Sequence, residues 1–264
     1  MKKTLAILNL LSVVLVIVVN YISQVVEFNG VTIGEMSRRY DNLFTPAGYA
    51  FSIWGIIFLL LLAYCIYQIR IAFARKNTSE AITQTGPWFI IANIMNCIWV
   101  IVFAYDFTGL SVLVMLCILF SLLKVVLNTN MERWDAPIGM IAFIWWPICM
   151  YSGWIAVATI ANIAAYLSKI GWDGGPLSEV SWTLIMIIVT TLVNLLMIYK
   201  RNMREFALVG IWALIAIYTR HRDSYDQIAY TALACGALLF LAISVHGYRN
   251  RATNPVLKFM KRKN

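Results

Sequence analysis

The stretch WIAVATIAN, residues 154–162, carries no charge and lies inside an apolar run that extends from residue 141 to residue 167. A run of this length can cross the hydrocarbon core of a bilayer, for which roughly 20 helical residues are needed. In a helix, Trp154, Ala158 and Asn162 follow at steps of four and share one face within about 80°. The stretch therefore predicts a membrane-spanning helix with an aromatic and amide face.

The rest of the chain has the composition of a membrane protein. Of its 264 residues, 61% are hydrophobic and 12% are charged, whereas about a quarter of the residues of an ordinary soluble domain are charged. The first apolar block, residues 4–24, is longer than the core of a secretion signal and no small-x-small cleavage site follows it. We therefore expect an all-α integral membrane protein with several spans, and a first helix that is retained.

Apolar runs bounded by charges or by glycine and proline clusters predict eight spans. Each must be helical, because an open strand edge in lipid would leave backbone groups without hydrogen-bond partners. The seventh run is short for a crossing, and Arg204 and Arg220 at its ends can extend it by snorkelling. The predicted spans cover residues 4–24, 46–67, 87–105, 110–126, 141–167, 181–199, 206–218 and 228–245.

The distribution of basic residues predicts the orientation of these spans. With the amino terminus inside the cell, 16 of the 21 Lys and Arg residues fall on the cytoplasmic side, as the positive-inside rule requires. Both termini are then cytoplasmic, and the net charge of +9 needs no nucleic-acid partner. The turn-rich segment 171–176 separates residues 1–168 from additional spans in residues 177–248, and a basic cytoplasmic tail follows at residues 249–264.

The sequence offers few residues for catalysis or metal binding. The five cysteines lie inside apolar blocks without metal-ligand spacing, and the two histidines lie in or beside loops. The sequence does not exclude a haem that is held by one histidine. Soluble-enzyme motifs are absent, and no ionisable residue falls in the middle of a span, which disfavours an ion-coupled transporter. We expect no catalytic residue, no metal ligand and no required cofactor.

Aromatic and amide residues recur in two other predicted spans. Asn96 and Trp99 lie along one side of the third span, and Tyr49, Phe51 and Trp54 cluster at the outer end of the second. Taken singly, such a tryptophan is more often an interface anchor and such an asparagine more often an interhelical hydrogen bond. If these residues converge, they would form an aromatic pocket for a flat, largely apolar ligand.

Three motifs resemble the TspO/translocator protein family of tryptophan-rich sensory proteins. Residues 44–54 (FTPAGYAFSIW) resemble its Trp-x-Pro-Pro-x-Trp-x-Phe…Trp segment, with departures at Phe44, Ala47 and Tyr49. Residues 96–99 resemble its Asn-x-x-Trp, and residues 154–162 match its Trp-x-x-x-Ala-Thr-x-x-Asn. The resemblance implies a five-helix bundle over residues 1–168, followed here by about three additional transmembrane helices.

The resemblance also implies a function. Members of the family bind porphyrins or sterol-like molecules in a pocket that the first loop closes. By matching position, the ligand-binding residues of this chain are Pro46, Tyr49, Phe51, Trp54, Asn96, Trp99, Trp154, Ala158 and Asn162.

The expected protein is thus a membrane-embedded binding or sensory protein for a planar apolar ligand. Two alternatives stay open: a facilitative small-molecule transporter and a porphyrin-modifying enzyme, of which the enzyme lacks a visible general base. The expected partners are membrane lipid and the ligand itself, a porphyrin or haem being the one cofactor that the resemblance suggests. A homodimer and a location in a bacterial cell membrane are compatible with this prediction.

Overall fold

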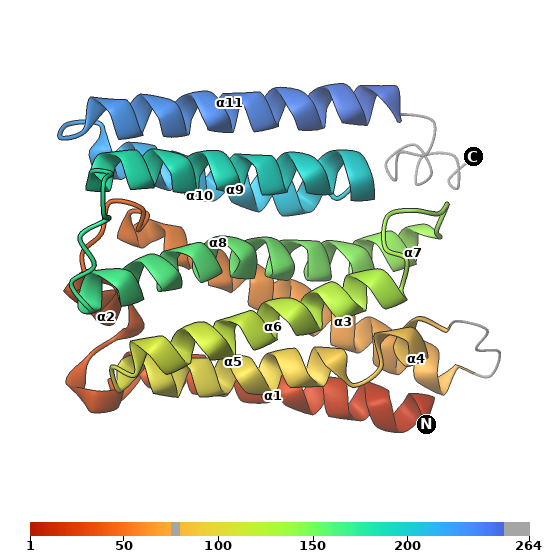
Figure 1. Cartoon of the computed structure of the whole chain (residues 1–264). Coiled ribbons are helices and arrows are strands. Elements are labelled where there is room, and N and C mark those ends of the chain that lie inside the picture. The colour runs from red at the N-terminus through yellow and green to blue at the C-terminus, as the bar shows by residue number, and fades with distance from the viewer. Residues whose placement is uncertain (75–79, 251–264) are drawn as a thin grey trace.

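The computed structural model describes residues 1–74 and 80–250, and these residues form helices without a strand (Figure 1). Within this part of the chain, eight helices have 17 residues or more. They are α1 (Lys2–Val25), α3 (Ile53–Phe73), α5 (Trp88–Ala104), α6 (Thr108–Asn128), α8 (Trp146–Lys169), α9 (Glu179–Arg201), α10 (Arg204–His221) and α11 (Asp226–Arg249).

Six segments are long and apolar enough to cross a membrane, which confirms the prediction of an all-helical protein with several membrane-length helices. They comprise α1, α3 with the turn before it, α6, α8 with the turns before it, α9 and α11. Helix α5 has 17 residues and is shorter, and α10 is not among the six. All eight predicted runs coincide with a long helix, and each helix extends beyond its run at one end or both, except α5.

The short elements were not predicted. Helix α2 (Ile33–Arg39) lies in the first loop, and α4 (Ala81–Thr85) precedes α5. Thr32 caps α2: its hydroxyl accepts a hydrogen bond from the Glu35 backbone N–H at 3.1 Å, and the Glu35 carboxylate accepts from the Thr32 N–H at 2.8 Å. This reciprocal arrangement satisfies two backbone donors that a helix start otherwise leaves unpaired.

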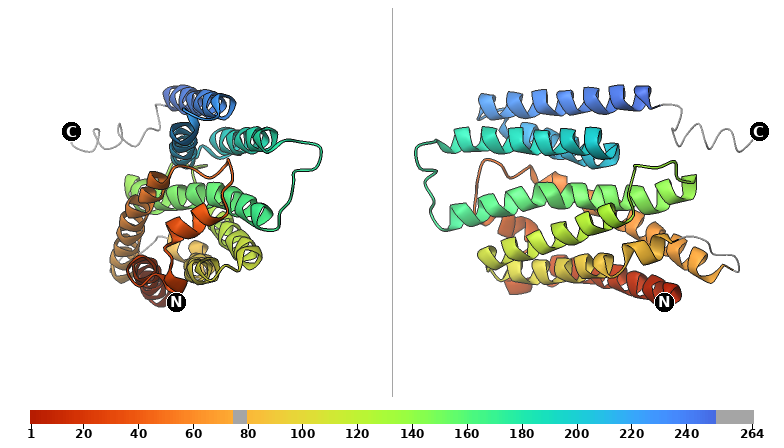
Figure 2. Two further views of the ribbon diagram at one scale, coloured as in Figure 1. Left: turned by 90° about the vertical axis from the view of Figure 1, so that its left-hand side faces the viewer. Right: turned by 45° about the vertical axis from the view of Figure 1, so that its right-hand side comes forward.

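The long helices form two groups (Figure 2). Helices α1, α3, α5, α6 and α8 pack as one bundle, and α9, α10 and α11 pack against one another beside it. Helix α10 makes the contact with the bundle, along α8. At Gly153 of α8, an added Cβ atom would lie 2.9 Å from the carbonyl oxygen of Phe206, so the missing side chain allows the two backbones to approach closely.

The first loop is attached to the second group of helices. The Ala47 N–H donates to the carbonyl of Ala216 at 3.1 Å, and the Trp212 indole N–H donates to the carbonyl of Ala50 at 3.0 Å. Phe44 is fully buried among apolar residues that come mainly from α9, α10 and α11. The segment that leads from the first loop into α3 is therefore fixed between the two groups.

Both ends of the described chain lie at the same end of the molecule (Figure 1). Met1 precedes α1 there, and α11 ends there at Arg249. The loop after α6 lies at this end too, while α2 lies at the opposite end (Figure 1). Most of the predicted basic tail, residues 251–264, falls outside the described residues, as do Arg75 and Lys76 of the orientation count.

Candidate ligand-binding site

A cavity lies beneath α2, among α3, α5, α6 and α8, and most of the predicted site residues line it. Three segments distant in the sequence supply them: the lip of residues 45–54, α5 and α8. Eight of the nine predicted residues are among its lining: Pro46, Phe51, Trp54, Asn96, Trp99, Trp154, Ala158 and Asn162.

The face of α8 forms one wall of this cavity. Trp154 and Asn162 are buried, and Ala158 lies between them on the same side of the helix. The ring of Phe51 meets the ring of Trp154 edge-on, with 6.0 Å between centroids. Trp54 meets Tyr151 of α8 in the same way at 5.8 Å. These edge-to-face contacts fix the lip against α8.

The two amides are held by other protein groups. Asn162 Oδ1 accepts a hydrogen bond from the Trp99 indole N–H at 2.7 Å, and its amide nitrogen donates to Ser111 Oγ at 2.9 Å. Asn96 donates to the Tyr151 hydroxyl at 3.2 Å and accepts from the Asn20 amide at 3.1 Å. Both amides thus make interhelical hydrogen bonds, which is the more common role of asparagine in a membrane.

The lining of the cavity is apolar and uncharged. It includes Phe103, Met115 and Ile155 beside the predicted aromatic residues, and among the lining residues there is no Asp, Glu, His, Cys, Lys or Arg. A metal ion would find only amides, hydroxyls and the Met115 thioether here, and no charged ligand. The cavity offers ring faces and aliphatic groups, which suit a flat apolar molecule.

The cavity is small in this conformation. Its volume is about 50 Å³, where roughly 10–15 Å³ on the same measure holds one water molecule. A ligand with a macrocyclic ring can enter only if the lip or α2 moves outward.

A wider, charged vestibule lies above the cavity. It has a volume of about 430 Å³ and shares Ser37, Thr45, Pro46 and Phe51 with the cavity lining. Arg38, Asp41 and Arg220 also line it. These three residues could not be predicted from the sequence, because charged residues in loops are common. Only the fold brings them over the apolar cavity.

Arg220 fastens the end of the first loop to α10. Its guanidinium donates to the carbonyl of Asn42 at 3.0 Å and to the carbonyl of Thr45 at 2.6 Å, and it pairs with the carboxylate of Asp41. Its donors are thus engaged within the protein. Arg38 is exposed and forms no salt bridge with any described residue, so it is the cation of the vestibule that is available to an anionic ligand group.

The C-terminal end of α2 is fastened to the bundle through Asp106. The Tyr40 hydroxyl donates to the Asp106 carboxylate at 2.8 Å, and Lys169 at the end of α8 pairs with the same carboxylate at 2.9 Å. Met36 of α2 is fully buried against the bundle. Helix α2 therefore closes the cavity as a fastened cover.

Tyr49 is the one predicted site residue that lies outside the cavity. Its side chain is 44% exposed, its ring centroid lies 5.4 Å from that of Trp212, and its hydroxyl lies 3.1 Å from Thr219 Oγ1. The reason is local: residues Gly48–Ser52 form a 3-10 turn, whose side chains follow at about 120° and not at the 100° of an α-helix. Tyr49 thereby faces α10.

A larger groove, about 550 Å³ in volume, lies between α8 and α9. Trp172 and Trp182 line its outer end, with 5.0 Å between their ring centroids. None of the nine predicted residues lines this groove. The motif residues therefore identify the cavity beneath α2, despite its smaller volume.

Comparison with known families gives one match. The model of the family described as TSPO-like protein matches residues 6–245, which include α9, α10 and most of α11. The three helices after residue 176 are thus part of the pattern that the family shares, and not an addition outside it. A search of curated proteins and a search of solved structures each returned no match.

Proposed function

Because the chain belongs to the TSPO-like protein family, we propose that it binds a planar, largely apolar ligand in the cavity beneath α2. The observation that carries the proposal is the convergence of eight motif residues from three separate segments on one uncharged cavity. Ligand sites are typically concave and mostly apolar, with a few polar groups at their margin. The role would be that of a membrane-embedded binding or sensory protein.

Six membrane-length apolar helices and the family membership make the chain an integral, multi-pass membrane protein. We propose that α5 and α10 cross the membrane as well, which gives eight spans with both termini in the cytoplasm. Two observations support this. Helix α5 packs along α1 and α6, and α10 packs along α8, α9 and α11. The two ends of the described chain also lie at the same end of the molecule. The cavity and α2 then face the outer side.

The vestibule favours a porphyrin over a sterol. A porphyrin with carboxylate side chains has an apolar ring for the aromatic walls and anionic groups for Arg38. A sterol would leave the charged lining of the vestibule without a partner. We therefore propose that the ring lies between Trp54 and Trp154 and that the carboxylates lie toward Arg38.

Binding would require α2 or the lip to move. The closed cavity of about 50 Å³ does not hold a macrocycle, so the binding-competent conformation is a minor one. The apparent affinity then falls by the fraction of molecules that are open.

The experiment is a titration of the purified protein in detergent with protoporphyrin, followed by tryptophan fluorescence. We expect saturable quenching, and an affinity lowered at least about tenfold in Trp154→Ala, the loss of one well-packed ring contact. Trp172→Ala is the matched control, because Trp172 lies outside the cavity. Absence of saturable quenching, or equal affinity in Trp154→Ala and the wild type, would refute the proposal.

Neither alternative function is favoured by a specific observation. A transporter in which the last three helices complete a pathway should have polar residues of those helices at the cavity, but every lining residue precedes residue 166. Asn194 and Thr190 of α9 instead hydrogen-bond within their own helix. An enzyme acting on the pigment would need a general acid or base, and the lining residues include none.

A further inference from the structure

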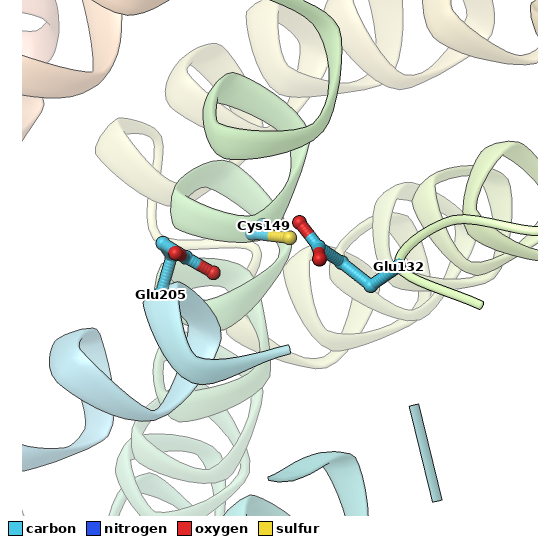
Figure 3. Close-up of side chains that lie close together, drawn as sticks. All are labelled: Glu132, Cys149 and Glu205. Atoms are coloured by element: carbon cyan, nitrogen blue, oxygen red, sulfur yellow. The ribbon is translucent and has the colours of Figure 1, made fainter. Parts of the chain in front are cut away.

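Three candidate metal ligands meet at the end of the molecule opposite the cavity. One carboxylate oxygen of Glu132, the Sγ of Cys149 and one carboxylate oxygen of Glu205 all lie within 4.8 Å of one another (Figure 3). Glu132 belongs to the loop after α6, Cys149 to α8 and Glu205 to the first turn of α10. In Figure 3 the thiol and the Glu132 carboxylate point toward one another, and Glu205 approaches from the second group of helices.

One oxygen atom of each carboxylate in this cluster is buried without a hydrogen-bond partner among the described residues. Glu132 Oε1 and Glu205 Oε2 are shielded from solvent and accept no hydrogen bond from any described residue. Neither carboxylate forms a salt bridge within the described chain. A buried carboxylate oxygen that is left unpaired is costly. A bound cation would supply the missing partner to both.

The thiol of Cys149 makes only one weak contact with the described residues. Its side chain is fully buried, with 0% exposed, and its one hydrogen-bond partner is the thioether sulfur of Met131 at 3.8 Å. A thioether is a weak acceptor, so little is lost when this contact breaks and the sulfur turns to a bound ion. Binding of the ion would release the thiol proton to water and leave a thiolate ligand.

An independent observation comes from the neighbouring cavity. Glu132, Trp145, Trp146 and Arg204 line a space of about 250 Å³ beside the cluster. The side chain of Trp145 is only 2% exposed, and its indole N–H has no hydrogen-bond partner among the described residues. This buried donor needs a hydrogen-bond acceptor in the space, such as a water molecule or a small anion coordinated to a metal ion.

We propose that Glu132, Cys149 and Glu205 bind a divalent transition-metal ion, with Zn²⁺ as the typical case, and that a water molecule in the adjacent cavity completes the coordination. Zn²⁺ accepts thiolate and carboxylate ligands and takes four of them in a tetrahedron. Mg²⁺ and Ca²⁺ prefer oxygen ligands alone, so the central thiol selects against them.

The charge of the surroundings is compatible with this ion. A thiolate and two carboxylates carry three negative charges, of which a divalent ion balances two. Arg204 lines the adjacent cavity, and Arg201 donates to the carbonyl of Val126 at 2.9 Å, close to Met131. These guanidinium groups offset the remaining negative charge.

The loop that carries Glu132 is held by the second group of helices. The Asn202 amide donates to the carbonyl of Glu132 at 2.7 Å, and His246 of α11 contacts Asn202 Oδ1 at 3.1 Å. Glu132 itself has a left-handed backbone with φ of 60°, a conformation that a glutamate rarely adopts. The ion would therefore join the five-helix bundle to α10 at the end away from the ligand cavity.

The experiment is a titration of the chelator-treated, purified protein with Co²⁺ under reducing conditions, followed by the thiolate-to-cobalt charge-transfer absorption. We expect saturation at one ion per chain, loss of the charge-transfer band in Cys149→Ala, and affinity reduced at least tenfold in Glu132→Gln and in Glu205→Gln. Cys65→Ala is the matched control, because Cys65 is also fully buried but lies in α3, and its titration should equal that of the wild type.

A second measurement covers the case in which Cys149→Ala does not fold. Zn²⁺ should raise the melting temperature of the wild type and of Cys65→Ala, with a much smaller rise in the Glu132→Gln/Glu205→Gln double variant. The proposal is overturned if the wild type shows no saturable binding, if the band persists in a folded Cys149→Ala variant, or if Zn²⁺ stabilises the double variant as much as the wild type.

Discussion

Trp99 donates its indole N–H to Asn162 Oδ1 at 2.7 Å, so two motif residues of the cavity wall are partners of each other. The hydrogen bond joins α5 to α8 in the part of the bundle beneath α2. Asn162 therefore maintains the shape of the cavity wall. Its amide is engaged within the protein, so the cavity offers a ligand its aromatic ring faces.

Replacing Asn162 by Ala should destabilise the protein by about 1–3 kcal/mol, because it leaves the buried Trp99 N–H without an acceptor. The measurement is the unfolding free energy in detergent, with Trp99→Phe as the partner variant. The double variant should lose clearly less than the sum of the single losses, since Trp99→Phe removes the orphaned donor. Additive losses would mean that the hydrogen bond does not couple the two residues.

Arg38→Gln should weaken protoporphyrin binding about two- to five-fold, the value of one exposed ion pair of about 0.5–1 kcal/mol. Binding of the dimethyl ester of protoporphyrin should not change, because the ester has no carboxylate. Arg39→Gln is the matched control: Arg39 is absent from the vestibule lining and lies 3.9 Å from Asp106. Equal effects on acid and ester would argue against a carboxylate at Arg38.

Gly153→Ala should destabilise the protein by about 1–3 kcal/mol, the usual effect of overpacking. Its new methyl group would lie 2.9 Å from the carbonyl oxygen of Phe206 and force α8 and α10 apart. Gly236→Ala in α11 is the control, because its nearest neighbour would be at 3.8 Å, an ordinary contact. A thermal melt of both variants in the same detergent decides the matter, and similar melting temperatures would contradict the expected close approach.

Acid should loosen the cover helix α2. Hydrogen bonds from the Thr32 backbone N–H and hydroxyl, with a smaller contribution from Arg38, hold the pKa of Glu35 below its usual 4.5. The stability that this carboxylate gives α2 is therefore present above about pH 4.5 and is lost as the pH falls through the lowered pKa.

Hydrogen exchange of the amides of residues 33–39, corrected for intrinsic rates, measures this effect. Protection in the wild type should decrease on going from about pH 5.5 to about pH 3.5. Glu35→Gln keeps a side-chain acceptor for the Thr32 N–H but cannot titrate, so its protection should change less than that of the wild type; any remaining change is that of other carboxylates such as Asp106, which also holds α2. A wild type whose protection does not change with pH would show that the carboxylate charge plays no part.

The long helices could be predicted from the sequence because lipid imposes length and apolarity on each of them independently. All eight runs were located, whereas α2 was not, although Thr32 and Glu35 have the spacing of a capping box. The run around α2 is short and polar, so hydropathy gives no signal there. Its position over the cavity depends on Tyr40 meeting Asp106, 66 residues away.

Most of the candidate ligand-binding site could also be predicted from the sequence. Residues at helical spacing, such as Trp154, Ala158 and Asn162, could be placed on one face, and they line the cavity. Tyr49 could not, because its direction depends on a 3-10 turn. Glu132, Cys149 and Glu205 form no local pattern at all, since only the packing of α10 on α8 brings the last two together.

The attachment of residues 44–54 to the second group of helices gives one explanation for the three substituted positions of the motif, Phe44, Ala47 and Tyr49. Phe44 is buried among residues of the second group, the Ala47 N–H bonds to Ala216, and Tyr49 contacts Trp212. All three departures thus face α9, α10 or α11, while Pro46, Phe51 and Trp54 face the cavity. Residues 44–54 thus contact the second group of helices on one side and the cavity on the other, so a substitution at residue 44, 47 or 49 would change this attachment and leave the cavity lining in place.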